Sequence, residues 1–246
     1  MAIGAEDHSY DALAREAAAL LERPGARLPV LFGIAGAVGV GKSTTAEIIR
    51  TRLKAHGVTP EVIATDGFLL PNVELERRRL TLRKGFPETF DHEALVDVLG
   101  RLRTGAPSVE VPRYSHQTYD RVPGPGRVLA PAHVVIVEGV DALQPPVADW
   151  LDIALYIEAH EADLQAWFVS RFLDLCREAE QDMTDTSFYA SFADVPEQER
   201  RALADSAWVH VNAVNLREHI APSRARATHV LEKNADHTVQ ALKRVR

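Results

Sequence analysis

Residues 36–43 carry the residue types and the spacing of a phosphate-binding loop. Glycines at 36 and 41 precede Lys42 and Ser43, so the segment fits the pattern G-x-x-x-x-G-K-[ST] at each fixed position. Glycines let the backbone curl until successive N–H groups point at one spot, and the following helix adds its positive N-terminal end. The lysine then reaches the β- and γ-phosphates and the serine ligates Mg²⁺. The motif predicts a nucleoside triphosphate site, for which we expect ATP and Mg²⁺. The residues expected to contact the nucleotide are Gly36, Ala37, Val38, Gly39, Val40, Gly41, Lys42, Ser43 and Thr44.

Two carboxylates each follow an apolar run. Asp66 comes directly after residues 61–65 and Glu138 directly after residues 134–137, and both runs are typical of buried strands. Because ligands bind where parallel strands end, both side chains are expected beside the phosphates. Mg²⁺ prefers hard oxygen ligands, and a hydroxyl acceptor needs a proton acceptor. We assign Asp66 as the general base and Glu138, with Ser43, to the metal; the reverse assignment of the two carboxylates stays open.

An arginine is expected on the apolar side of a helix at residues 161–176. The apolar stripe of that helix consists of Leu164, Trp167, Phe168, Phe172 and Leu175. Arg171 has the same helical spacing, and an unpaired guanidinium there is costly, so it needs an anion. It either pairs with a neighbouring carboxylate or meets the phosphoryl group during transfer, where a cation stabilises developing charge. In the second interpretation the segment that begins at Arg171 is part of a lid.

The remaining elements must hold these groups in place. Apolar runs predict strands at 30–34, 61–65, 108–111, 134–137, 153–157 and 229–232. Helices are predicted at 11–22, 43–56, 91–103 with Asp91 as N-cap, 161–176 and 196–216, whereas 69–90 is expected to be irregular. The alternation indicates an α/β fold with three layers, a mainly parallel sheet flanked by helices and a helical lid. We expect a short N-terminal helix within residues 1–27 and a single P-loop kinase domain over 28–246, with the lid and acceptor region at about 161–195.

Composition narrows the class of protein. The chain has 246 residues and a formal net charge of -7, which argues against a general nucleic-acid binder. Its single cysteine, Cys176, excludes an intramolecular disulfide, and no segment has the pattern of a signal peptide or a membrane span. We expect a cytoplasmic protein with a small-molecule substrate and no nucleic-acid or membrane partner.

Several segments together resemble the bacterial type I pantothenate kinases, a family within the P-loop group of uridine kinase and phosphoribulokinase. The similar segments are 65–72 (TDGFLLPN), 83–91 (RKGFPETFD), 114–116 (YSH), 137–139 (VEG), 171–172 (RF), 215–217 (NLR) and 222–224 (PSR). They follow one order from about residue 30 to the C-terminus. The resemblance implies transfer of the γ-phosphate of ATP to the primary hydroxyl of pantothenate, the first committed step toward coenzyme A. It also implies a homodimer.

The resemblance implies roles for individual residues as well. The implied catalytic residues are Asp66 as base, together with Lys42 and Arg171. His237 matches a histidine that lies near adenine. The implied acceptor pocket comprises Tyr114, His116, Tyr119, Phe168, Arg171, Phe172, Phe188, Tyr189, Phe192 and His219.

Four positions depart from the family pattern. Glu47 stands where the family has an arginine that binds the phosphates of coenzyme A, so we expect weak or absent inhibition by coenzyme A. Phe168 replaces a tyrosine, and Asp141 and His219 replace asparagines, all in or near the acceptor pocket. A pocket built to hydrogen-bond its substrate discriminates strongly. Three alternatives therefore stay open: pantothenate, another hydroxylated metabolite such as a sugar or nucleoside, and an ATP-hydrolysing switch without a small acceptor.

Overall fold

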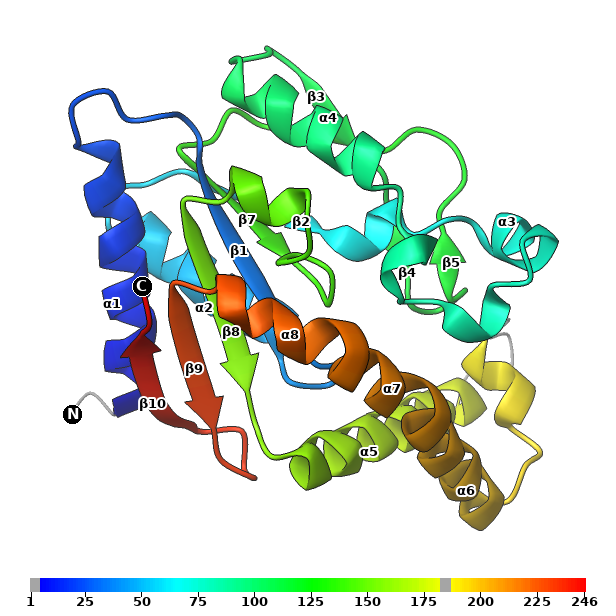
Figure 1. Cartoon of the computed structure of the whole chain (residues 1–246). Helices are drawn as coiled ribbons and strands as arrows, with labels where there is room; N and C mark the ends of the chain where they lie inside the picture. Colours follow the sequence, from blue (N-terminus) through cyan, green and yellow to red (C-terminus); the bar gives the residue numbers. More distant parts are fainter. Residues whose placement is uncertain (1–4, 182–186) are drawn as a thin grey trace.

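A mainly parallel sheet of six strands forms the centre of the protein (Figure 1). The computed structural model describes residues 5–181 and 187–246. The strand order is β10-β9-β8-β1-β7-β2, and only β10 runs antiparallel to its neighbour. The strands are β1 (Val30–Gly36), β2 (Pro60–Ala64), β7 (Val134–Glu138), β8 (Ile153–Glu158), β9 (His229–Lys233) and β10 (Val239–Arg244). β1 and β7 are buried along their whole length, as expected for apolar strands covered on both faces of a parallel sheet.

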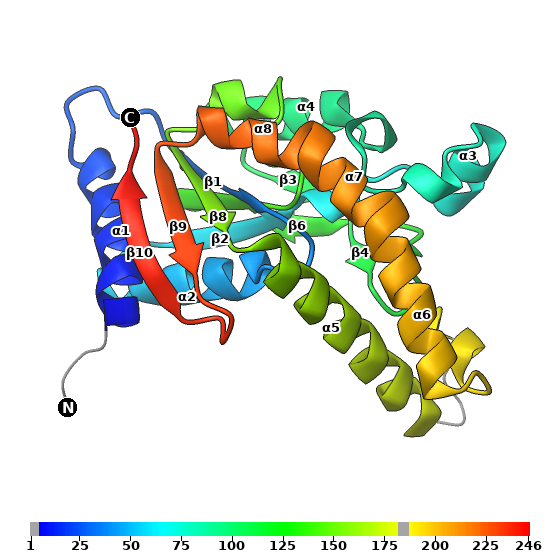
Figure 2. The ribbon, with the colours of Figure 1, turned by 60° about the horizontal axis from the view of Figure 1, so that its bottom comes forward.

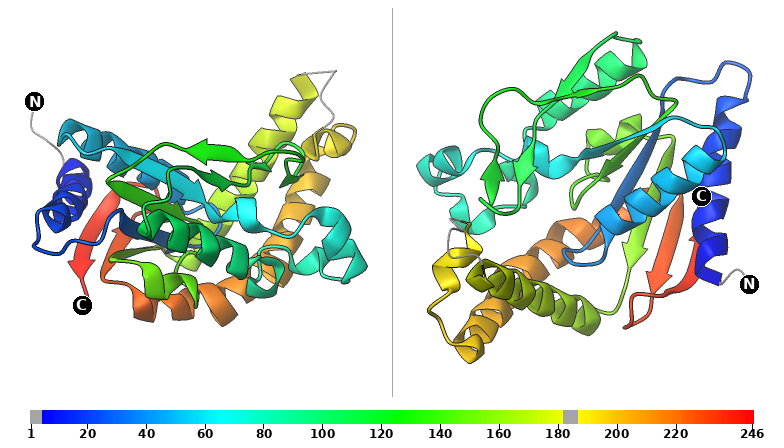
Figure 3. Two further views of the ribbon diagram at one scale, coloured as in Figure 1. Left: turned by 90° about the horizontal axis from the view of Figure 1, so that it is seen from above. Right: turned by 180° about the vertical axis from the view of Figure 1, so that it is seen from behind.

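Helices cover both faces of the sheet, so the predicted three-layer α/β fold is confirmed. Figure 2 shows α2 (Lys42–Ala55) on one face and α4 (His92–Arg103), α7 (Ala213–Asn215) and α8 (Ala221–Ser223) on the other. From behind, α1 (Ala5–Leu21) lies beside α2 (Figure 3). The helix α1 begins six residues before the predicted start at residue 11, and it buries Tyr10, Leu13, Ala14 and Ala17 in the main core. The predicted N-cap of α4 is confirmed, since the Ala94 N–H donates to Asp91 Oδ1 at 3.0 Å.

Two helices project from the sheet, and the first of them lies in the region of about 161–195 that was predicted to contain the lid. α5 (Glu161–Gln181) and α6 (Glu197–Ala207) extend together away from the strands (Figure 2). After α6 the chain stays helical through two π-helical turns, Trp208–Asn212 and Leu216–Ile220, and reaches Ser223 by way of α7 and α8. The predicted helix end near residue 216 was therefore wrong. Pro222 does not stop the helical path, because it lies in the first turn of α8, where a proline is tolerated.

Short elements escaped the sequence analysis. Residues 69–90 contain α3 (Asn72–Arg77) and turns of 3-10 helix, so the irregular excursion expected there is partly helical. The predicted strand near 108–111 is β3 (Val109–Val111), which pairs with β6 (Arg127–Leu129), while β4 (Tyr114–Ser115) pairs with β5 (Asp120–Arg121). Strands of two or three residues and the final strand β10 are too short or too polar to show periodicity. Among the helices of the described residues, none combines the length and the apolar character that spanning a bilayer requires.

Candidate active site

The phosphate loop joins β1 to α2, and its glycines hold it in a curl. Gly41 directly precedes α2 with a φ of 89°, in the left-handed region that favours glycine. The loop is braced from β9, because Lys233 Nζ donates to the Val40 carbonyl at 3.1 Å. Lys42 folds back over the loop and donates to the Ala37 carbonyl at 2.9 Å. Thr44 is exposed in the first turn of α2. Lys42 and the N-terminus of α2 therefore both lie at the phosphate loop.

Four charges converge on this loop. Burial lowers the pKa of Lys42, Glu138 and Asp66 raise it, and Arg171 lowers it. Such interactions act over short distances, so all four groups lie near the loop. Within residues 5–181 and 187–246, no carboxylate forms an ion pair with Lys42. With one of its three donors on Ala37, the ammonium keeps the other two for an anionic ligand.

Glu138 ends β7 directly beside the phosphate loop. Its side chain is 7% exposed, and the Ser43 hydroxyl donates to Glu138 Oε1 at 2.9 Å. Burial raises the pKa of Glu138, Lys42 lowers it and Asp66 raises it. The turn is tight because Gly139 follows: a β-carbon there would lie 1.8 Å from Thr65 Oγ1, which precedes Asp66. The glycine thus lets the ends of β7 and β2 come together with a carboxylate on each.

Asp66 lies between the phosphate loop and the β4–β5 hairpin. It is half-buried in a turn of 3-10 helix, Thr65–Phe68, that continues β2. Its charge raises the pKa of Lys42, of Glu138 and of His116 on the hairpin. One carboxylate thereby acts on charged groups of the phosphate loop, of β7 and of the hairpin.

The hairpin carries the three predicted acceptor residues on one side. The Tyr114 ring lies edge-on to His116, with centroids 5.3 Å apart, and 6.3 Å from the Tyr119 ring. Desolvation lowers the pKa of His116, Asp66 raises it, and Arg171 and Lys42 lower it. The lowered pKa favours the neutral imidazole of His116, which donates or accepts a hydrogen bond without adding a charge.

A network around Lys84 holds the hairpin, and the sequence analysis did not assign it a role. Lys84 Nζ donates to Asn72 Oδ1 at 2.6 Å and to the Tyr119 carbonyl, and it lies 4.3 Å from the Tyr119 ring centroid. The Asn72 backbone N–H donates to Asp120 Oδ1 at 3.0 Å. Tyr119 has a φ of 52°, which is strained for a bulky residue, so these bonds keep its ring in place.

On α5 the structure corrects the predicted position of Arg171. The buried side of this helix is formed by Leu164, Val169, Leu173, Cys176 and Ala179. Arg171 is exposed, and in the described part of the chain no ion pair involves it. The predicted apolar stripe differs from the buried side because Trp167, Phe168 and Phe172 are only half-buried. The paired interpretation of Arg171 has no support, and its charge acts instead on Lys42, Glu138 and His116.

Aromatic side chains join α5 to the turn of 3-10 helix Tyr189–Phe192. Phe172 lies edge-on to Tyr189 and to Phe192, with ring centroids 6.0 and 5.2 Å apart. The same turn meets the hairpin, since Phe188 N–H donates to the Gln117 carbonyl at 2.7 Å and its ring stacks on Tyr119 at 4.9 Å. The predicted aromatic residues of α5 and of the turn therefore form one continuous wall with Tyr119 of the hairpin. On its other side, Phe168 packs against Trp208, with centroids 5.8 Å apart.

A buried pair, His92 and Asp141, lies near His219. His92 Nε2 is 2.5 Å from Asp141 Oδ2, and Asp141 is 2% exposed. Burial raises the pKa of Asp141, His92 and His219 lower it and Asp66 raises it, so His219 and Asp66 flank the same carboxylate. The His219 Nε2 atom is buried without a hydrogen-bond partner, and its ring lies edge-on to Phe86 at 5.7 Å.

The predicted adenine residue, His237, lies at the turn between β9 and β10. Its ring stacks on Trp167 with centroids 3.8 Å apart, and the Trp167 indole N–H donates to the Ala235 carbonyl at 3.0 Å. The backbone of Trp167 and Phe168 adjoins Gly39 of the phosphate loop. His237 is thus brought to the nucleotide side of the site by an aromatic partner that the sequence analysis left unassigned.

Comparison with known proteins identifies the family. Residues 31–171 match the model of the phosphoribulokinase/uridine kinase family. This chain belongs to that family. The pantothenate kinase of Leifsonia xyli subsp. xyli is 44% identical over 223 residues, which cover 87% of this chain and 69% of the relative. That of Sorangium cellulosum is 43% identical over 231 residues, 90% of this chain and 74% of the relative.

A solved structure agrees with the family assignment. The putative fructose transport system kinase of Silicibacter sp. TM1040 superposes with a TM-score of 0.68 and 27% identity, over 85% of this chain and 92% of that one. The predicted resemblance to pantothenate kinases is confirmed, and the chain is a phosphotransferase with an alcohol acceptor.

In this kinase the fold brings most of the predicted residues together. Lys42, Glu138, Asp66, His116 and Arg171 interact electrostatically across five separate segments. The residues that the sequence analysis left without a role are Asn72, Lys84, His92, Trp167 and Asn215. Lys84 lies in the segment 83–91 (RKGFPETFD) that the resemblance already singled out, and His92 directly follows it. That segment could therefore have pointed to both residues.

Proposed function

We propose that this kinase transfers the γ-phosphate of ATP to the primary hydroxyl of pantothenate. The relatives that are 41–44% identical over most of the chain are pantothenate kinases. The observation that carries the proposal is the place of Asp66, whose charge acts on Lys42 of the phosphate loop and on His116 of the hairpin. A nucleotide switch without a small acceptor needs no carboxylate between the phosphate loop and a second group of binding residues such as the hairpin.

The residues present fit a magnesium ion. A hydroxyl and a carboxylate, Ser43 Oγ and Glu138 Oε1, lie 2.9 Å apart beside the phosphate loop, and both are hard oxygen ligands. In the described residues no three His, Cys, Asp or Glu side chains form a ligand cluster, which agrees with an ion that takes most ligands from phosphates and water. Bound there, Mg²⁺ supplies positive charge to the β- and γ-phosphates.

The chain's own groups divide the transfer between them. Asp66 accepts the proton of the acceptor hydroxyl. The hydroxyl oxygen then bonds to the γ-phosphorus while the bond between that phosphorus and the departing ADP breaks. Lys42 and Arg171 place positive charge against the phosphoryl oxygens, where charge develops. Because such transition states are loose, positioning and charge supply most of the rate. His237, stacked on Trp167, borders the adenine side.

The acceptor is held between the two walls of the site. We assign the acceptor wall to Tyr114, Tyr119, Phe172, Tyr189 and Phe192, with His116 as the hydrogen-bonding group nearest Asp66. His219 and Phe168 complete the pocket. A second candidate acceptor, a sugar or nucleoside hydroxyl, is favoured by His219 Nε2, which has no hydrogen-bond partner, near the His92–Asp141 pair; these groups make a more polar wall than the asparagines of the family pattern would.

One experiment separates the candidates. ADP release is measured with wild-type protein, ATP and Mg²⁺ against pantothenate, pantetheine, nucleosides and sugars, with Asp66→Asn as the control. We expect pantothenate-dependent turnover that Asp66→Asn loses while it still binds ATP by calorimetry. Turnover with a sugar or nucleoside alone selects the second candidate, and a rate independent of any acceptor contradicts both.

The setting follows from this proposal. We propose that the kinase works in the cytoplasm, with small molecules as its partners. Its net charge of -7 agrees with the absence of a nucleic-acid partner. We also propose the homodimer that the family resemblance implies, and sedimentation velocity tests it.

A further inference from the structure

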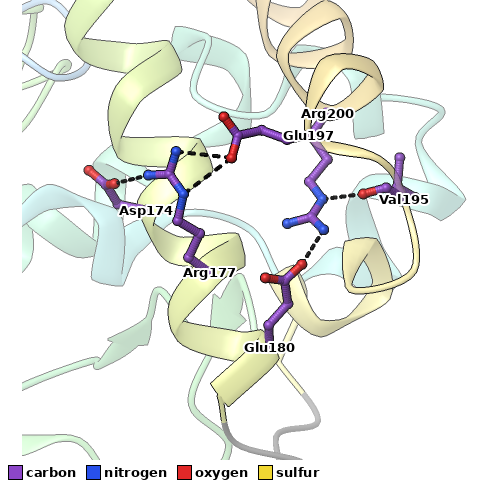
Figure 4. Close-up of polar contacts among 6 residues, drawn as sticks. All are labelled: Asp174, Arg177, Glu180, Val195, Glu197 and Arg200. Carbon is purple, nitrogen blue, oxygen red and sulfur yellow. Dashed lines mark hydrogen bonds and ion pairs between the residues drawn. The ribbon is translucent and has the colours of Figure 1, made fainter.

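Arg200, at the start of α6, is a buried cation that holds three segments of the lid region (Figure 4). Its side chain is 7% exposed and pairs with Glu180 near the end of α5. Its Nε donates to the Val195 carbonyl and one Nη donates to the Ala193 carbonyl at 3.0 Å. A buried guanidinium is tolerated only when it is paired and hydrogen-bonded, and this one is both.

The two carbonyls belong to the stretch that directly follows the aromatic turn Tyr189–Phe192. That turn packs Tyr189 and Phe192 against Phe172, the neighbour of Arg171. Among the described residues, the hydrogen bonds and ion pair of Arg200 involve none of the residues assigned to catalysis or binding. It donates hydrogen bonds to the backbone just after the turn Tyr189–Phe192, whose aromatic rings form the wall.

The other end of the turn is held independently. Phe188 N–H donates to the Gln117 carbonyl of the hairpin at 2.7 Å, and the Phe188 ring stacks on Tyr119 at 4.9 Å. The turn is therefore held at the hairpin by Phe188 and at α6 by Arg200, in addition to the packing of its rings on Phe172 of α5. Without the hydrogen bonds of Arg200, the turn keeps its hairpin contact but loses its fixed distance from α5.

We propose that Arg200 is a positioning residue for acceptor binding, acting through the turn Tyr189–Phe192. The proposal rests on the function proposed above, because the wall in question is the acceptor wall. The phosphate loop, Ser43 and Glu138 lie on other elements, so nucleotide binding does not depend on Arg200.

The chain offers a matched control on the same two helices. Arg177 of α5 pairs with Asp174 at 2.7 Å and with Glu197 of α6 at 3.1 Å, but its side chain is 45% exposed and it contacts neither carbonyl (Figure 4). Exposed pairs of this kind contribute little. Arg177→Gln removes an arginine that bridges α5 and α6 without releasing the turn.

The first measurement needs no acceptor. Hydrogen–deuterium exchange is followed by mass spectrometry in peptides that cover residues 187–195 and, separately, the phosphate loop. Arg200→Gln is expected to speed exchange in 187–195 at least tenfold and to leave the loop unchanged, whereas Arg177→Gln matches wild type in both. Unchanged exchange in 187–195 overturns the proposal, whatever the substrate proves to be.

The second measurement splits the kinetic constants, with the acceptor that wild-type protein turns over. Arg200→Gln is expected to raise the acceptor KM about tenfold or more, with the KM for ATP within twofold of wild type. Arg200→Lys keeps a charge opposite Glu180 but lacks the planar fork, so a smaller rise is expected. A KM for ATP that rises equally, or an unchanged acceptor KM in Arg200→Lys when Arg200→Gln does not fold, overturns the positioning role. Failure of wild type to use pantothenate bears only on the proposed function.

Discussion

Arg171→Gln is expected to remove most of the turnover of this kinase and almost none of its stability. Arg171 is exposed on α5 and no described residue forms an ion pair with it, so its loss leaves no buried partner unpaired. Surface substitutions of this kind usually change the free energy of unfolding by less than about 0.5 kcal/mol. The charge nevertheless acts on Lys42, Glu138 and His116, so it reaches the place where the phosphoryl group passes.

The expected loss follows from the electrostatics. A unit charge about 4 Å from the phosphoryl oxygens interacts by about 4 kcal/mol at an effective dielectric constant of about 20. At about 1.4 kcal/mol for each factor of ten, that corresponds to a loss of roughly 10³-fold in kcat. Arginines that meet a transferring phosphoryl group contribute about 10³- to 10⁵-fold, so the two figures agree.

The assay compares kcat from coupled ADP release, at saturating ATP and acceptor, with the melting temperature from calorimetry. Arg177→Gln, on the same helix but paired with Asp174 and Glu197, is the control and is expected to keep both values. Arg171→Lys is expected to keep part of the rate, since it retains the charge without the planar fork. A kcat within about tenfold of wild type in Arg171→Gln would show that the arginine is merely solvated, and the reasoning would be refuted.

Three further predictions concern pH, stability and regulation. Burial lowers the pKa of Lys84 to about 8, and Asp120 and Asp66 oppose the shift, so its charge is present below about pH 8 and lost above it. The acceptor kcat/KM should therefore fall as the pH rises past 8 in wild type but not in Lys84→Arg, which stays charged; identical pH profiles would contradict this. Asp91→Ala removes the cap on Ala94 and should lower the free energy of unfolding by about 1 kcal/mol, seen as a lower melting temperature, whereas the exposed Asp97→Ala on the same helix should leave it unchanged. Glu47 pairs at the surface with Arg50 at 2.9 Å, and we expect coenzyme A to inhibit Glu47→Arg more strongly than wild type; equal inhibition curves would rule out a role for this position.

Groups that belong to a local pattern could be predicted well. The phosphate loop begins at the end of β1, Glu138 ends β7 and Asp66 lies two residues after β2, so the end of each strand and its chemistry are adjacent in the chain. Parallel pairing then brings the strand ends to one edge of the sheet, as the register of Ile34 and Ala64 with Glu138 shows. The cap at Asp91 is local in the same way.

Groups whose role depends on a distant partner could not be predicted. Helical spacing alone placed Arg171 on the apolar side of α5, but the buried side is decided by what packs against the helix, and α6 covers Val169 and Leu173 instead. In sequence Lys84 is an ordinary surface lysine, and its position depends on Asn72 and on the Tyr119 carbonyl, 12 and 35 residues away along the chain.

The nucleotide half of this active site was readable from consecutive residues, because a loop that binds phosphate with its own backbone needs only short-range geometry. The acceptor half was not, because its walls come from a hairpin, a lid turn and a helix whose side chains meet only after the chain has folded. Packing placed Phe188 on Tyr119, His92 on Asp141 and Arg200 beneath the aromatic turn. Burial in the folded chain lowers the pKa of His116 and raises that of Asp141, which no local pattern contains.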